Sequence, residues 1–234
     1  MRVLITRPEQ DAERTAAKLS ALGHQAIVES LFLIEPIKFH LPEGSFSALA
    51  ATSANALRAA AKGESLSKFH SLPLFAVGGQ TGDVAREAGF EKIEIASGDI
   101  HSLAKLLMDR LTRGARVLYL AGESRAEDIS ALVASSGIIV ATLIVYRARA
   151  AARFSAAIRE KILAKEIDVV LHYSPRAAQT FLALANYDKL DAALITMDHL
   201  CLSAAVAAPL LAKGAKVQIA AKPNERALFA LLAA

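Results

Sequence analysis

The sequence predicts an α/β protein with two doubly wound parallel-sheet domains, related by an internal repeat and joined by a two-stranded linker. Short β-branched strands alternate with Ala-rich helical stretches, one set of segments occurs twice in the same order, and the composition supports large buried cores. Of the 234 residues, 54% are hydrophobic and 21% are charged. This composition excludes the disordered, collagen-like and disulfide-scaffold classes.

The alternation is clearest at the amino terminus. It predicts a strand over residues 2–6, a helix over 10–22 that stops at Gly23, and a strand over 26–29.

Residues 129–146 form an uncharged stretch that is just long enough for a membrane-spanning helix. Ser135-Ser136-Gly137 interrupts this stretch near its middle. The pattern therefore favours a helix, a glycine stop and a β-branched strand over membrane insertion.

The repeat links the two halves of the chain. Three pairs of segments recur in one order: 2–4 with 116–118, 46–55 with 167–176, and 88–103 with 213–228. Chance similarity between Ala-rich segments is the alternative, but the shared order favours one βαβ pattern used twice.

Two extended segments hold equivalent places in the two halves, 30–39 and 142–150, and both carry charges near their ends. We interpret them as crossovers that pair with each other, so that the first βαβ unit packs with the last third of the chain. The predicted domains are residues 1–36 with 149–234, and residues 37–148. Separate folding of each half is the alternative that the sequence leaves open.

No cofactor or metal motif is recognisable. The chain lacks a G-x-x-x-x-G-K-[ST] loop, and the glycines within 77–82 fit the dinucleotide fingerprint in no frame. The six histidines show no metal-ligand spacing, and most are expected at the surface. The single cysteine, Cys201, is expected to be a buried, inert thiol. We therefore expect no cofactor and no metal.

Small hydroxylic residues follow four predicted strands at turns that lead into helices. Backbone N–H groups and the helix dipole attract carboxylates or phosphates there, and open α/β sheets bind ligands at this edge. The alternative at each turn is simple helix capping. The turns are Thr52-Ser53-Ala54-Asn55, Gly78 to Thr81, Tyr173-Ser174-Pro175-Arg176 and Leu202-Ser203-Ala204. A net charge of +4 and a pI of about 9.2 favour an anionic small molecule over nucleic acid.

Six short motifs together resemble the uroporphyrinogen-III synthase family over nearly the whole chain. They are Leu4-Ile5-Thr6-Arg7-Pro8, Thr52-Ser53-Ala54-Asn55-Ala56, Ala76-Val77-Gly78-x-x-Thr81, Leu120-Ala121-Gly122-x-x-Arg125, Val145-Tyr146-Arg147 and Tyr173-Ser174-Pro175. The family's late turn carries Gly-Pro-Thr-Thr or Ser-Pro, whereas this chain has Ser203-Ala204-Ala205-Val206.

The resemblance implies a cofactor-free lyase of tetrapyrrole and haem biosynthesis that works in the cleft between its domains. Such an enzyme cyclises linear hydroxymethylbilane to uroporphyrinogen III, losing water and inverting ring D through a spiro intermediate. Tyr146 matches the family's tyrosine, a general acid in that reaction, with packing at a strand end as its alternative role. The residues expected to bind substrate carboxylates are Thr52, Ser53, Asn55, Gly78, Thr81, Arg125, Ser174 and Ser203.

Two other classes of function remain as alternatives. One is a bilobed polycarboxylate-binding protein without catalysis, and the other is a regulatory module on the same fold. Charged residues flank a short apolar run at the amino terminus, so a signal peptide is not expected. We expect a cytoplasmic monomer. The expected partners are an anionic tetrapyrrole and the enzyme that produces hydroxymethylbilane, with no nucleic acid and no membrane.

Overall fold

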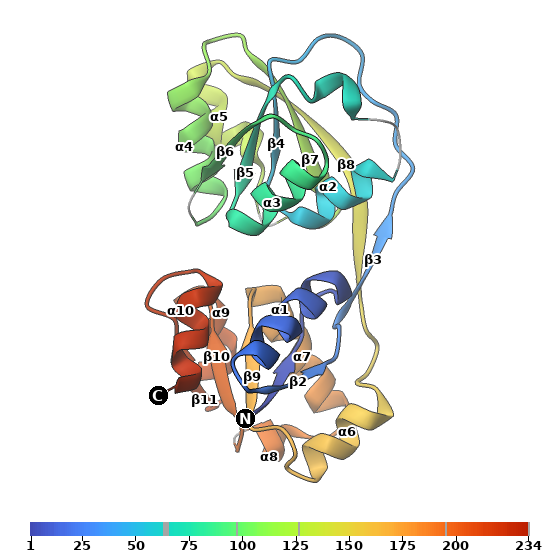
Figure 1. Ribbon diagram of the computed structural model, residues 1–234, viewed down its shortest axis with the longest axis vertical. Helices are drawn as coiled ribbons and strands as arrows, with labels where there is room; N and C mark the ends of the chain where they lie inside the picture. Colours follow the sequence, from blue (N-terminus) through green and yellow to red (C-terminus); the bar gives the residue numbers. More distant parts are fainter. Residues whose placement is uncertain (63–65, 97, 126, 195, 234) are drawn as a thin grey trace. The chain divides into compact units, whose positions relative to one another are not determined.

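The computed structural model describes residues 1–62, 66–96, 98–125, 127–194 and 196–233 (Figure 1). They form two compact units: unit 1 comprises Met1–Leu33 and Arg149–Ala234, and unit 2 comprises Ile34–Ala148. The chain leaves unit 1 within β3 (Phe32–Pro36) and returns within β8 (Ile139–Ala150). Both termini therefore belong to unit 1.

Unit 1 is built on a five-stranded parallel sheet in the order β11-β10-β9-β1-β2. Its strands are β1 (Arg2–Ile5), β2 (Gln25–Val28), β9 (Val169–His172), β10 (Asp198–Cys201) and β11 (Lys216–Ile219). Because β1 pairs with both β2 and β9, the first βαβ unit packs with the last third of the chain.

Helices cover both faces of this sheet (Figure 1). Leu19 of α1 and Leu228 of α10 pack on one face together with Leu200, whereas Ala178 of α7 and Val206 of α9 pack with Cys201. The helices of unit 1 are α1 (Glu9–Ala21), α6 (Ala156–Leu163), α7 (Pro175–Tyr187), α8 (Asp191–Leu194), α9 (Ala204–Leu211) and α10 (Glu225–Ala230), and Leu231–Ala233 adds a 3-10 turn.

Unit 2 is built on a sheet in the order β3-β8-β7-β4-β5-β6, in which β4 to β8 are parallel. Its inner strands are apolar runs, as expected for parallel strands that are buried on both faces. They are β4 (Ala48–Ala51), β5 (Pro73–Val77), β6 (Lys92–Ala96) and β7 (Arg116–Gly122).

Two helix layers also cover the sheet of unit 2. Leu57 and Val84 pack with Leu49 on one face, and Leu103 packs with Ala50 on the other. The helices are α2 (Ala54–Ala61), α3 (Gly79–Glu87), α4 (Ile100–Arg110) and α5 (Ile129–Val133), with 3-10 turns at Ser67–Phe69 and Ala134–Ser136. The predicted doubly wound α/β class is confirmed.

The two sheets have equivalent strand orders. The strands β4, β5, β6, β7 and β8 are arranged as β9, β10, β11, β1 and β2 are in unit 1. The sequence repeat follows this equivalence, since residues 2–4 lie in β1 and 116–118 in β7. In each sheet the strand order reverses at one point, between β4 and β7 in unit 2 and between β9 and β1 in unit 1.

The predicted pairing of the two crossover segments is confirmed. β3 and β8 are neighbours, the Ile37 N–H donates to the Val145 carbonyl, and the Ala151 N–H donates to the Leu31 carbonyl, both at 2.9 Å. The residue number rises along one segment as it falls along the other, so the two segments run antiparallel.

The uncharged stretch 129–146 also folds as predicted. It forms α5, a 3-10 turn and β8, with Gly137 at φ 75° in the left-handed region where the helical part stops. No helix within the described ranges combines the length and the apolar character that a membrane crossing requires.

Candidate functional site

In unit 2, polar side chains gather where the strand order reverses. Thr52 follows β4, Arg125 follows β7, and Tyr146 on β8 pairs with Gly122, the last residue of β7. These strands are neighbours in the sheet, so the sequence motifs that carry these residues meet at one edge. Ligands of open α/β sheets bind at this position.

Tyr146 is held against the end of β7. The register between β7 and β8 shifts at Ala121/Gly122, and the Glu123 N–H donates to the Tyr146 carbonyl at 2.9 Å. A Cβ atom on Gly122 would lie 2.7 Å from Cζ of Tyr146 and 2.9 Å from its hydroxyl oxygen. The half-buried ring therefore occupies space that exists because residue 122 is glycine.

Thr52 contacts a tyrosine that the sequence analysis did not single out. The Thr52 Oγ1 lies 2.9 Å from the hydroxyl oxygen of Tyr119, which is 2% exposed. Burial raises the pKa of Tyr119, and the hydrogen bond with Thr52 and the charge of Arg125 offset only part of this effect. Tyr119 lies within an apolar run of the sequence, which is typical of a core residue. Its hydroxyl group was the single feature in the sequence that could have indicated a polar role.

Arg125 supplies a cation at this edge. Its Nη1 donates to the carbonyl of Gly122 at 3.1 Å, and its side chain is exposed. Its charge also lowers the pKa of Asp128, although that carboxylate depends mainly on its hydrogen bonds with Ser130.

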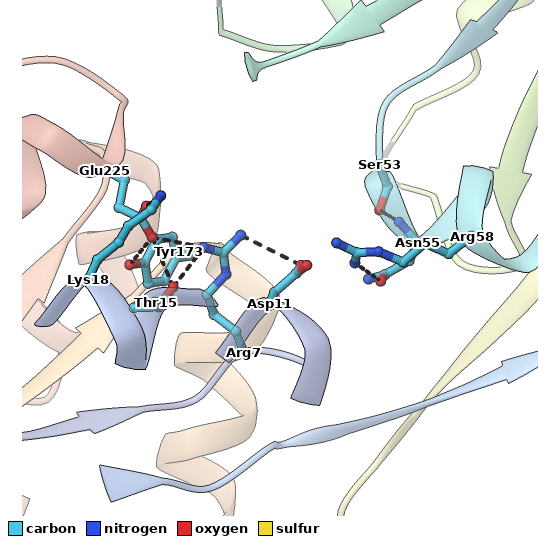
Figure 2. A network of polar contacts seen from close by, with 9 residues as sticks. All are labelled: Arg7, Asp11, Thr15, Lys18, Ser53, Asn55, Arg58, Tyr173 and Glu225. Atoms are coloured by element: carbon cyan, nitrogen blue, oxygen red, sulfur yellow. Dashed lines mark hydrogen bonds and ion pairs between the residues drawn. The ribbon is translucent and has the colours of Figure 1, made fainter. Parts of the chain in front are cut away.

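Ser53 and Asn55 form the start of α2. The Ser53 Oγ accepts from the Asn55 N–H at 3.2 Å, and the Asn55 Oδ1 accepts from Nη1 of Arg58 at 3.1 Å (Figure 2). Ser53 is thus a helix cap, as the alternative interpretation expected. A hydroxyl oxygen that accepts from the backbone still keeps its own O–H for a ligand.

The turn after β5 offers backbone groups more than side chains. Gly78 precedes α3 at φ 76°, and its N–H donates to the Ala96 carbonyl at 3.1 Å. A Cβ atom built at Gly78 or Gly79 would have no neighbouring atom within 4 Å. Thr81, in the first turn of α3, is buried with 4% exposure, so its side chain faces the protein.

In unit 1, the two predicted serines differ in how they meet their helices. The Ser174 Oγ accepts from the Ala177 N–H at 3.1 Å and caps α7. Ser203 precedes α9 without such a side-chain bond, and it is half-buried. The turn that departs from the family pattern therefore has a hydroxyl that does not cap its helix.

A polar network at the ends of β1 and β9 was not predicted (Figure 2). The Arg7 guanidinium lies over the Tyr173 ring, 4.1 Å from its centroid, and its Nη1 donates to Glu225 Oε1 at 3.2 Å. The Tyr173 hydroxyl and the Thr15 hydroxyl also donate to Oε1, at 3.0 and 2.9 Å, and Lys18 pairs with Oε2.

The network fixes the charge state of its members. Burial alone raises the pKa of Glu225, but the hydrogen bonds from Lys18 and Thr15 and the cationic charges bring it below its ordinary value. Burial and the Glu225 charge raise the pKa of Tyr173. Arg7 also pairs with Asp11 at 3.6 Å, so this arginine contacts two carboxylates. Two motifs, Leu4 to Pro8 and Tyr173 to Pro175, were the sequence signals for this region.

Cys201 is buried in β10, and burial raises its pKa to about 12, as expected for an inert thiol. Within the described residues, no group of three or more His, Cys, Asp or Glu side chains could hold a metal ion.

The fold and these sites define an α/β protein of two doubly wound units, with polar groups at the strand ends where such sheets bind small ligands. The chain belongs to the uroporphyrinogen-III synthase HemD family, whose model matches residues 13–230. The resemblance seen in the motifs is confirmed.

Solved structures support the fold. Uroporphyrinogen-III synthetase from Helicobacter pylori 26695 is 18% identical, with a TM-score of 0.68 and coverage of 100% of this chain and 99% of that one. A mutant uroporphyrinogen III synthase from the extremely thermophilic bacterium Thermus thermophilus is 17% identical, with a TM-score of 0.56 and coverage of 100% and 96%. No curated protein sequence matches the chain.

Proposed function

We propose that the chain carries out the reaction of its family, the cyclisation of hydroxymethylbilane to uroporphyrinogen III, as a lyase that releases water. The family match over residues 13–230 carries this conclusion. The non-catalytic alternative, a polycarboxylate-binding protein, is not favoured by that match.

In the reaction, the hydroxyl of the ring A hydroxymethyl group departs and leaves an azafulvene cation. The substituted α-carbon of ring D attacks this cation to form a spiro intermediate, which fragments and closes again with ring D inverted. The uncatalysed closure gives the uninverted type I isomer, so the protein must select a geometry. Holding reacting groups in place can supply several kcal/mol of a barrier.

We assign the carboxylate-binding role to groups at the strand ends of each unit. Hydroxymethylbilane carries eight carboxylates, and the helix starts after β4, β5, β9 and β10 present backbone N–H groups. Ser53 and Ser174 add hydroxyl protons, Gly78 adds an open backbone position, and Arg125 adds a positive charge. Ser203, whose hydroxyl does not cap α9, is assigned the same role.

Tyr146 is the proposed general acid for departure of the ring A hydroxyl. Its phenol is half-buried beside the cluster of Thr52 and Arg125, and the contact with Gly122 fixes its ring. A positioned side chain that protonates a leaving group contributes about 10²–10⁴-fold to a rate.

Three finer assignments belong to the same proposal. The protein works as a cytoplasmic monomer, needs no cofactor, and receives its substrate from the enzyme that releases hydroxymethylbilane. The single cysteine fits a reducing compartment. An unstable substrate that closes spontaneously favours a short path between the two enzymes.

Freshly prepared hydroxymethylbilane tests the function directly. The purified chain should convert it to the type III isomer, faster than the reaction without protein, which gives type I. Type I product at the spontaneous rate would contradict the proposal. Tight binding of hydroxymethylbilane without turnover would indicate the non-catalytic alternative.

A further inference from the structure

We propose that Tyr119 is a positioning residue that orients the Thr52 hydroxyl as a hydrogen-bond donor toward a substrate carboxylate. This inference rests on the proposed function. The observation that supports it is the 2.9 Å distance between the Thr52 Oγ1 and the Tyr119 hydroxyl oxygen.

Burial restricts what the Tyr119 hydroxyl can do. The residue is 2% exposed, in the middle of β7. A buried phenol without a hydrogen-bond partner is costly, because it loses its bonds to water. Among the described residues, Thr52 is the partner of this hydroxyl. Thr52, in contrast, is half-buried at the carboxyl end of β4 and reaches the edge where ligands bind.

The chemistry of the two hydroxyls sets the direction of the bond. A phenol is more acidic than an aliphatic alcohol, so the Tyr119 O–H is the better donor and the Thr52 oxygen is the acceptor. Thr52 then has its own proton available for a second partner. In a chain of hydroxyls, the first hydrogen bond polarises and strengthens the second.

The surroundings favour an anion as that second partner. An ionised carboxylate only accepts hydrogen bonds, so it takes the Thr52 proton and leaves the Tyr119 bond intact. Arg125 and Tyr146 both act electrostatically on Tyr119, which places the pair in the cluster that holds the proposed acid and a cation.

The test is the Tyr119→Phe variant, which keeps the ring in β7 and removes the oxygen. Its KM for hydroxymethylbilane should rise about 3- to 10-fold, as expected when a hydrogen bond to a charged group is weakened. Its kcat should stay within about twofold and its product should remain type III, since the proposed acid is intact. Tyr187→Phe is the matched control, because Tyr187 is 62% exposed in unit 1, and its KM should not change.

A double-mutant cycle separates positioning from a structural role. Thr52→Val removes the donor, so Tyr119→Phe should raise KM no further in that background. Thr52→Ser keeps the hydroxyl, so the effect of Tyr119→Phe should return there. A general loss of packing would instead lower the melting temperature and raise KM in all three backgrounds.

The outcomes distinguish this inference from the proposed function. Suppose that the unaltered chain makes type III product. If Tyr119→Phe then leaves KM unchanged, or if it raises KM further in the Thr52→Val background, the positioning role is wrong and the function stands. If the unaltered chain makes only type I product, both are wrong.

Discussion

The Nε2 of His172 lies 3.0 Å from Nδ1 of His199, and both imidazoles are fully buried at β9 and β10. The His199 Nε2 lies 3.0 Å from the Leu194 carbonyl, which can only accept, so this nitrogen carries a proton. The His199 Nδ1 then accepts from the His172 Nε2–H. The His172 Nδ1 is left as a buried acceptor without a partner among the described residues. Burial lowers the pKa of both rings and keeps the pair neutral in the folded protein, which is the state that these hydrogen bonds describe.

The histidine pair should make the protein sensitive to acid. Burial lowers the pKa of both rings, and the charge of His199 adds to the effect on His172. The unfolded chain therefore binds protons first as the pH falls below about 6.5, and stability present above that pH is lost. The free energy of unfolding, measured with urea from pH 7.5 to 5, should fall by up to about 1.4 kcal/mol per pH unit for each ring.

Two variants check this assignment. His172→Phe keeps an aromatic ring beside Phe181, which His172 contacts edge-on, and should roughly halve the acid slope. Tyr187→Phe, at an exposed position outside the pair, should leave the slope unchanged. An acid slope in His172→Phe equal to that of the unaltered chain would contradict the assignment.

Tyr146→Phe should lower kcat by about 10²-fold or less, because the electron-rich pyrrole already helps the hydroxyl leave and an acid adds only part of its usual effect. Single-turnover kinetics with isomer analysis measures this. KM and the type III outcome should be largely unchanged, since carboxylate contacts set the geometry. An unaltered rate would reduce Tyr146 to a packing residue, and type I product would indicate positioning.

Gly122→Ala should displace the Tyr146 ring, because the new Cβ would lie 2.7 Å from Cζ. We expect a stability loss of about 1–3 kcal/mol, typical of overpacking, together with a lower kcat. Gly79→Ala is the control for stability, since a Cβ there meets no atom within 4 Å. Denaturant unfolding should separate the two variants, and kcat of Gly122→Ala is compared with that of the unaltered chain; equal stability losses would mean that the Gly122 contact is unimportant.

Glu225→Gln should destabilise unit 1 by about 1–3 kcal/mol, because charge-assisted hydrogen bonds from Arg7, Lys18 and Tyr173 lose their carboxylate. Urea unfolding at pH 7 measures this loss. Glu160→Gln, on the exposed surface of α6, should be close to neutral. If the two variants were equally stable, the network would be a surface feature without energetic weight.

Salt should weaken binding of the substrate. Its carboxylates meet a chain of net charge +4, and ionic screening shortens the reach of such attractions to about 8 Å at physiological salt. KM for hydroxymethylbilane should therefore rise between low and high salt. A KM independent of salt would mean that apolar burial of the pyrroles dominates.

The strands and the repeat were predictable because parallel strands buried on both faces leave apolar runs in the sequence, and because glycines mark where helices stop. The pairing of residues from opposite ends of the chain followed from the repeat.

The side-chain partners were less accessible to sequence analysis. Tyr119 reads as one more apolar residue of its strand, and its bond to Thr52 depends on the pairing of β4 with β7. His172 and His199 meet because β9 and β10 are neighbours, which spacing along the chain does not reveal. Thr81 was expected to bind substrate, but its side chain on α3 is buried and faces the protein interior.

The position of β1 between β2 and β9 also sets an order for events on the ribosome. Residues 1–33 emerge before unit 2, yet their sheet neighbour β9 ends at His172. At about 5–20 residues per second, the amino-terminal segment waits roughly 7 to 28 seconds for that partner. Unit 2 is continuous in sequence and can complete its core in the meantime. Residues 1–33 are thus made before unit 2 but reach their contacts with β9 only after it, and the apolar strand β1 must be kept from other partners until then.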